Sequence, residues 1–66
     1  MKLIVNGNEE ILLQTLTLQE LIEMKGWTPD TIVAELNLEI ISKKSWADIV
    51  LADNDRLEIL SFIGGG

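Results

Sequence analysis

The chain has 66 residues, 11 acidic against 5 basic side chains, a formal net charge of −6 and no cysteine. This length predicts one domain near the lower limit for a self-sufficient core, held by packing without disulfides. The negative charge disfavours nucleic acid as a partner. No apolar run reaches the roughly 20 residues that span a bilayer, and the start lacks a signal-peptide pattern, so we expect a cytoplasmic protein without a membrane partner.

The side chains that carry most enzyme chemistry are missing. Histidine, cysteine and tyrosine are all absent, which removes the commonest general base, the thiol nucleophile and the preferred ligands of zinc. The carboxylate pairs Glu9–Glu10 and Asp53–Asp55 could act as acid and base only inside a pocket, which so small a domain can hardly enclose. We interpret them as turn residues and solvated strand ends. The chain is therefore predicted to be no enzyme by itself and to hold no metal.

The first elements read as a β-hairpin. Residues 1–5 form a short apolar run that stops at Asn6-Gly7, a dipeptide typical of type I′ turns because both positions take positive φ. Residues 9–14 are predicted to return as the second strand.

A short helix with both ends marked follows. Thr17 and Glu20 have the spacing of a capping box, and an apolar stripe begins at Leu18. Lys25 suits the negative end of the helix dipole, and Gly26 is a ready left-handed terminator. The helix is predicted over residues 18–25.

The rest of the chain has the composition of strands and turns. Trp27 to Asp30 is a predicted turn, and Asn37 a turn point between two strands. Residues 42–48 are expected to be irregular, with Trp46 covering one end of the core. The three remaining strands are predicted at 31–36, 38–41 and 56–63, the last one preceded by a turn at 53–55.

This order predicts an α+β fold. A hairpin, one helix and three further strands do not make the alternation of a doubly wound sheet. The compact solution is a ubiquitin-like β-grasp domain over residues 1–63, with a four- to five-stranded mixed sheet packed on one main helix. Its first and last strands are expected to be central and parallel.

Three glycines end the printed sequence after the last strand. Gly64, Gly65 and Gly66 add no packing surface and lose much entropy on ordering, so they are poor strand residues. We expect them to form a flexible tail that carries a main-chain carboxylate away from the folded body. The plain alternative is an inert terminal segment.

At this point the sequence resembles the ThiS-type sulfur carrier proteins of thiamine biosynthesis. The resemblance covers essentially the whole chain. It depends on Val-Asn-Gly near the start, the segment Asn37 to Trp46, the acidic turn Asp53-Asn-Asp55 and the glycine end. Asn54 stands where glycine is usual, and Lys43 or Lys44 where arginine is common.

The resemblance implies the chemistry of the tail. A ThiF-type (E1-like) adenylyltransferase would use ATP and Mg²⁺ to adenylate the Gly66 carboxylate, and sulfur transfer would then yield a thiocarboxylate. A ThiG-type thiazole synthase would receive this sulfur for the thiazole moiety of thiamine. Gly65 and Gly64 would give access to narrow active sites, and the chain itself would bind no cofactor. The alternatives are a molybdopterin-type sulfur carrier, a ubiquitin-like protein modifier and a plain β-grasp binding module.

The last strand also suggests where partners dock. Leu57 and Ile59 alternate with Leu60 and Phe62, so the two pairs fall on opposite faces. If the first pair faces the helix, Leu60 and Phe62 form an apolar docking patch beside the tail. The alternative is that they pack beneath a loop or against Trp46.

Overall fold

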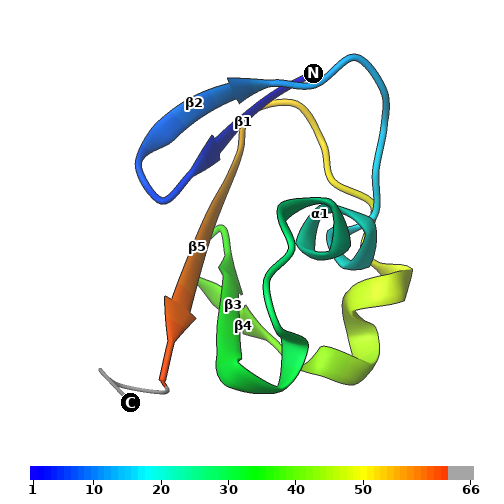
Figure 1. The fold of residues 1–66 in the computed structure, drawn as a ribbon. Helices are drawn as coiled ribbons and strands as arrows, with labels where there is room; N and C mark the ends of the chain where they lie inside the picture. Colours follow the sequence, from blue (N-terminus) through cyan, green and yellow to red (C-terminus); the bar gives the residue numbers. More distant parts are fainter. Residues whose placement is uncertain (63–66) are drawn as a thin grey trace.

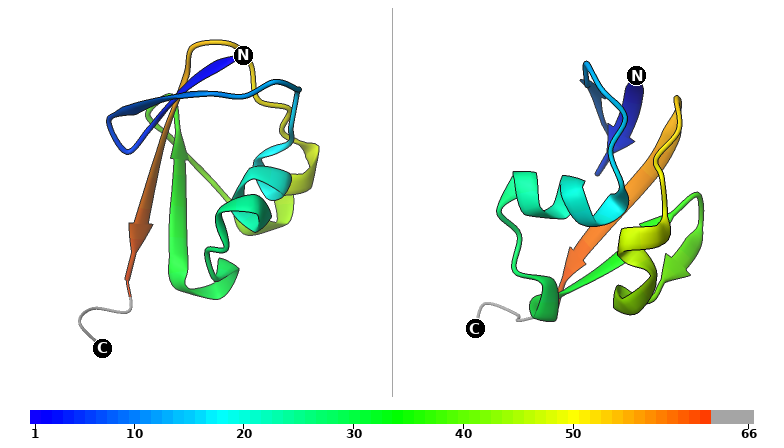
Figure 2. Two further views of the ribbon diagram at one scale, coloured as in Figure 1. Left: turned by 45° about the horizontal axis from the view of Figure 1, so that its top comes forward. Right: turned by 90° about the vertical axis from the view of Figure 1, so that its right-hand side faces the viewer.

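A computed structural model describes residues 1–62 of the chain, which form one five-stranded sheet crossed by a single α-helix (Figure 1). The strands are β1 (Lys2–Val5), β2 (Asn8–Ile11), β3 (Ile32–Leu36), β4 (Glu39–Ile41) and β5 (Asp55–Ser61). The helix is α1 (Leu18–Lys25), and two 3-10 segments are η1 (Pro29–Thr31) and η2 (Lys43–Asp48). Two further views show α1 lying against one face of the sheet, with η2 beside it (Figure 2).

The sheet has the order β2-β1-β5-β3-β4. β5 is its central strand, parallel to β1 on one side and antiparallel to β3 on the other. The two outer pairs, β1–β2 and β3–β4, are antiparallel hairpins. The prediction of central, parallel first and last strands is therefore confirmed.

The helix begins and ends at the predicted residues. The Thr17 hydroxyl accepts from the Glu20 N–H at 3.1 Å, and the Glu20 carboxylate accepts from the Thr17 N–H at 2.8 Å. At the other end Gly26 adopts a φ of 73°, and its N–H donates to the Glu23 carbonyl. These contacts satisfy main-chain groups that a helix end otherwise leaves without partners.

We expect Thr17→Ala to lower the free energy of unfolding by about 0.5–2 kcal/mol, the usual cost of losing an N-cap side chain. Urea denaturation followed by far-UV circular dichroism measures this loss. Thr17→Ser is the matched control because it keeps the hydroxyl, and it should stay close to the parent chain. Equal stability of the alanine and serine variants would contradict the prediction.

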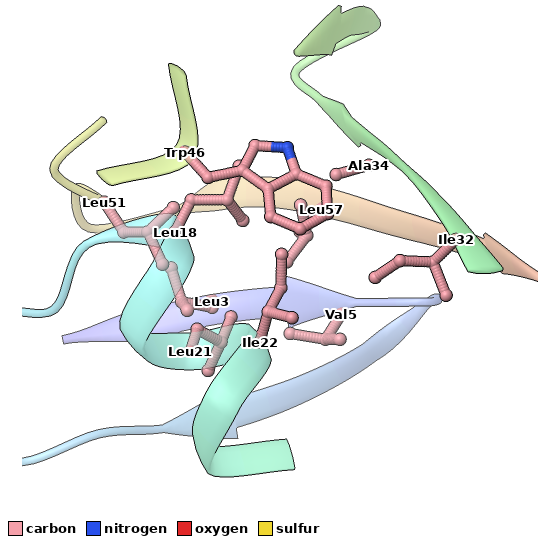
Figure 3. Close-up of a cluster of buried hydrophobic side chains, with 10 residues drawn as sticks. All are labelled: Leu3, Val5, Leu18, Leu21, Ile22, Ile32, Ala34, Trp46, Leu51 and Leu57. Carbon is pink, nitrogen blue, oxygen red and sulfur yellow. The ribbon is translucent and has the colours of Figure 1, made fainter. Parts of the chain in front are cut away.

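The core lies between α1 and the inner face of the sheet (Figure 3). Leu18, Leu21 and Ile22 of the helix are fully buried, as are Leu3 of β1 and Leu57 of β5. The other buried members of the cluster are Val5, Ile32, Ala34, Trp46 and Leu51.

Two predictions are wrong, and a third can be compared only as far as residue 62. The second strand ends at Ile11 rather than at residue 14, and Leu13 is 99% exposed in the connection that follows. Residues 43–48 form the 3-10 helix η2 instead of an irregular segment. Its Trp46 does not merely cover an end of the core: the side chain is 1% exposed, and its Nε1–H donates to the Ile41 carbonyl at 3.0 Å. The last strand ends at Ser61, and residue 63 lies outside the described residues.

Three of the four paired carboxylates make structural contacts, and two of these three lie in the predicted turn 53–55. Asp53 accepts the Lys2 N–H at 2.7 Å and Asp55 accepts the Ala52 N–H at 2.8 Å, while Asn54 has a φ of 71°. Asparagine tolerates this left-handed conformation where glycine would be usual. Glu10 forms an ion pair with Lys25, which ties β2 to the end of α1.

Candidate functional site

The candidate site is the end of β5, because this strand leads toward the three glycines. Gly64, Gly65 and Gly66 themselves lie outside the described residues, so the predictions made for them stay predictions. The strand that precedes them is firmly held. Leu57 is fully buried under α1, and β5 pairs with a neighbour on each side.

Two asparagines at the hairpin turns hold β5 from both sides. Asn6 lies in the β1–β2 turn, and its side-chain oxygen accepts the Ile59 N–H at 2.8 Å. Asn37 lies in the β3–β4 turn, and its side-chain oxygen accepts the Arg56 N–H at 2.9 Å. Both residues have a φ of 49°. The positive φ makes the turn, and the side chain then replaces a missing strand neighbour of β5.

Leu60 and Phe62 lie on the outer face of the sheet, away from α1. Their side chains are 57% and 61% exposed, whereas Leu57 on the opposite face is fully buried. Leu57 and Ile59 thus face the helix side, as the predicted docking patch requires. Leu60 and Phe62 do not pack beneath a loop or against the buried Trp46. Val33 of β3 stands directly opposite Leu60 and extends the apolar surface across the two strands.

A pair of carboxylates borders this apolar surface, and we could not predict it because it depends on strand register. Glu35 of β3 and Glu58 of β5 stand directly opposite each other, and Ile40 of β4 is the next residue across the sheet. Like charges in this arrangement repel each other. No ion pair within residues 1–62 includes either carboxylate. A basic group of a partner would relieve the repulsion.

Residues 1–62 contain no pocket and no group of three side chains suited to hold a metal ion. None of the helices described here has the length and apolar character that crossing a membrane requires.

These features define a ubiquitin-like β-grasp domain whose central strand leads to a glycine end. The model of the ThiS family matches residues 2–66. The chain belongs to this family, which confirms the resemblance to ThiS-type sulfur carriers found in the sequence.

Individual relatives agree with this assignment. The Sulfur carrier protein ThiS of Bacillus subtilis is 36% identical over 50 residues, 76% of each chain. A Thiazole synthase of Paramagnetospirillum magneticum is 41% identical over all 66 residues, which make up only 20% of that protein. The chain thus spans about one fifth of the thiazole synthases that it matches.

A solved structure confirms the fold. The thiamine biosynthesis protein (ThiS) of Geobacter metallireducens superposes with a TM-score of 0.86 and 30% sequence identity, and each chain is covered completely.

Proposed function

We propose that the chain carries sulfur as a thiocarboxylate on Gly66 and donates it during synthesis of the thiazole moiety of thiamine. The observation that carries this proposal is the family match, which extends through the glycines to residue 66. A carboxylate is a poor electrophile, so it must first be activated. A ThiF-type adenylyltransferase would transfer AMP from ATP to the carboxylate with release of pyrophosphate, Mg²⁺ neutralising the phosphate charges.

The second step replaces AMP with sulfur. Sulfide (HS⁻) attacks the acyl carbon, AMP leaves with the electron pair of the broken C–O bond, and loss of the S–H proton leaves the thiocarboxylate on the carrier. This chain needs to supply only its terminal carbonyl, which agrees with a sequence that lacks histidine and cysteine. Glycines at positions 64 and 65 would let the main chain enter a narrow, water-excluding site, since they have no Cβ atom. Such a chain is a cosubstrate of its partner enzymes.

The intact mass of the chain tests this proposal. The chain is incubated with the adenylyltransferase encoded in the same genome, ATP, Mg²⁺ and a sulfur source. We expect a mass increase that corresponds to exchange of one oxygen for sulfur, and it should vanish without ATP. A mass that never changes in the complete mixture would refute the sulfur-carrier mechanism.

Thiazole synthase is the proposed acceptor of the sulfur. Two thiazole synthases contain a segment similar to this whole chain, so in those proteins both units share one polypeptide. Sharing a chain gives two binding units a high effective concentration for each other. We infer that this chain also binds thiazole synthase when the two are separate polypeptides.

Leu60 and Phe62 form the proposed docking patch for the adenylyltransferase. Burying two large apolar side chains stabilises a complex by roughly 1.5–3 kcal/mol each when burial is complete. The carboxylates of Glu35 and Glu58 beside the patch would attract a partner with basic groups, in keeping with the net charge of −6.

We expect the double variant Leu60→Ala/Phe62→Ala to lower the kcat/KM of adenylation at least about tenfold, since each tenfold corresponds to only about 1.4 kcal/mol. Pyrophosphate release at varied carrier concentration measures it. Ile11→Ala is the matched control: Ile11 is 68% exposed on β2, at the far edge of the sheet. Unchanged kinetics in the double variant, or an equal loss in the control, would remove the patch from the docking surface.

A further inference from the structure

β5 extends beyond the strand that lies beside it. Its parallel pairing with β1 ends at Val5 and Leu57, because the chain turns away at Asn6-Gly7. β5 itself continues to Ser61. Figure 1 shows the strand running well past the β1–β2 turn. On the β3 side, by contrast, pairing continues to the end of the strand, where Ile32 stands opposite Ser61.

The hydrogen bonds show which main-chain groups point toward the β1 side. Phe62 N–H donates to the Thr31 carbonyl and Asn37 N–H to the Arg56 carbonyl, so the even-numbered residues of β5 bond to β3 and its turn. In an antiparallel pair the residues between them direct their N–H and C=O groups to the other side. Accordingly, the Leu57 carbonyl accepts from Asn6 N–H and the Ile59 N–H donates to the Asn6 side chain.

Past Asn6 these groups have no partner within residues 1–62. They are the Ile59 carbonyl and the N–H and carbonyl of Ser61, which we call the open edge of β5. Asn6 satisfies the first N–H after β1 ends, but its side chain reaches no further. The open edge is in line with β1, and an added strand there would complete the sheet alongside the residues that lead to the glycines.

We propose that an extended segment of thiazole synthase adds to the sheet at the open edge of β5, in line with β1. Main-chain hydrogen bonds of an added strand give affinity, while its alternate side chains contact the faces of the sheet. On the outer face such a strand would lie beside Leu60 and near Phe62, which are both more than half exposed. The added segment is therefore expected to present apolar side chains on that face.

Two observations favour thiazole synthase as the protein that supplies this strand: its proposed reaction with the tail and its presence on the same polypeptide in two relatives. This inference rests on the proposed function, in which that enzyme receives sulfur from Gly66. A strand at the open edge would lie beside the end of β5. It would therefore fix the direction of the residues that lead to the tail. In two relatives the enzyme already shares a polypeptide with this domain.

Amide hydrogen exchange at Ser61 tests the proposal. The unmodified chain is labelled with and without the thiazole synthase of the same genome. In the complex we expect the Ser61 amide to exchange at least about tenfold more slowly than in the free chain. The exchange rate of the Leu60 amide, which is already bonded to β3, should change less. Absence of a complex, or a Ser61 amide that exchanges as in the free chain, would overturn the proposal.

A main-chain variant adds a second test. Ser61→Pro removes an N–H that makes no bond to β3, so it should spare the fold and weaken binding about tenfold, as expected for one lost hydrogen bond at a desolvated interface. Ser61→Ala keeps the N–H and should bind like the parent chain. Equal affinity of all three chains would overturn the proposal, and the exchange experiment decides if the proline variant fails to fold.

Two further results separate this proposal from its alternatives. Protection of Ser61 that rises with the concentration of the chain alone would assign the open edge to a second copy and overturn the assignment to thiazole synthase. Binding and exchange are measured on the unmodified chain, so they do not depend on sulfur transfer. A chain that protects Ser61 in the complex but never gains sulfur would refute the proposed function and leave the strand addition standing.

Discussion

A chain that lacks Gly66 is expected to keep the stability of the full chain and to accept no sulfur. The shortened chain still ends in a glycine carboxylate, but that carboxylate is one residue closer to the folded body. A residue spans about 3.3–3.6 Å when extended, more than a reacting group can be displaced without losing most of its rate. Intact mass after incubation with the adenylyltransferase, ATP and a sulfur source measures the loss.

Two controls separate reach from folding. Thermal unfolding of the shortened chain should match that of the parent, since the core lies within residues 3–57. Gly66→Ala retains the length and the carboxylate but adds a Cβ atom, so it should react more slowly than the parent yet faster than the shortened chain. Sulfur uptake by the shortened chain at the parent's rate would show that the reaction does not depend on the distance of the carboxylate from the folded body.

Trp46→Ala is expected to remove a large part of the protein's free energy of unfolding. Truncating a buried tryptophan costs about 3–5 kcal/mol. A domain of this size has a free energy of unfolding of only roughly 3–10 kcal/mol, at about 0.05–0.15 kcal/mol per residue. Trp46 is 1% exposed and belongs to the same cluster as Leu18 and Leu57, so its loss leaves a cavity against both the helix and the central strand.

Urea denaturation followed by far-UV circular dichroism measures this effect. Trp46→Phe is the matched control because it keeps an aromatic ring and loses the hydrogen bond from Nε1 to the Ile41 carbonyl. It should fall between the parent and the alanine variant. A native-like denaturation midpoint for Trp46→Ala would contradict the burial of this side chain.

The local elements could be predicted because their signals lie within a few neighbouring residues. Asn6-Gly7 makes a turn through its own backbone angles, 49° and 84° in φ. The capping box of Thr17 and Glu20 sets the first residue of the helix, and the terminator Gly26 sets its last. These preferences act before any tertiary contact forms, so a single sequence is enough to read them.

The predictions that are wrong concern segments whose conformation depends on tertiary contacts. The segment 43–48 has no helical periodicity. Its 3-10 conformation places Trp46 in the core, where the Nε1–H donates to the Ile41 carbonyl. Residues 12–14 are predicted to continue the second strand, yet β1 begins at Lys2, and the hydrogen bonds between these two segments end at the pair of Met1 and Leu12. Pairing length depends on the partner strand, which propensity does not show.

The sequence by itself determined the β-grasp order of elements, the helix ends and the absence of histidine, cysteine and tyrosine. Through the resemblance to ThiS-type sulfur carriers, it also predicted the glycine end as the reactive group. Only the tertiary structure decided that Leu60 and Phe62 face solvent, that Glu35 stands against Glu58, and that Asn6 and Asn37 hold β5. The physical reason is that exposure and pairing depend on register between strands distant in sequence, and register is set when the core packs.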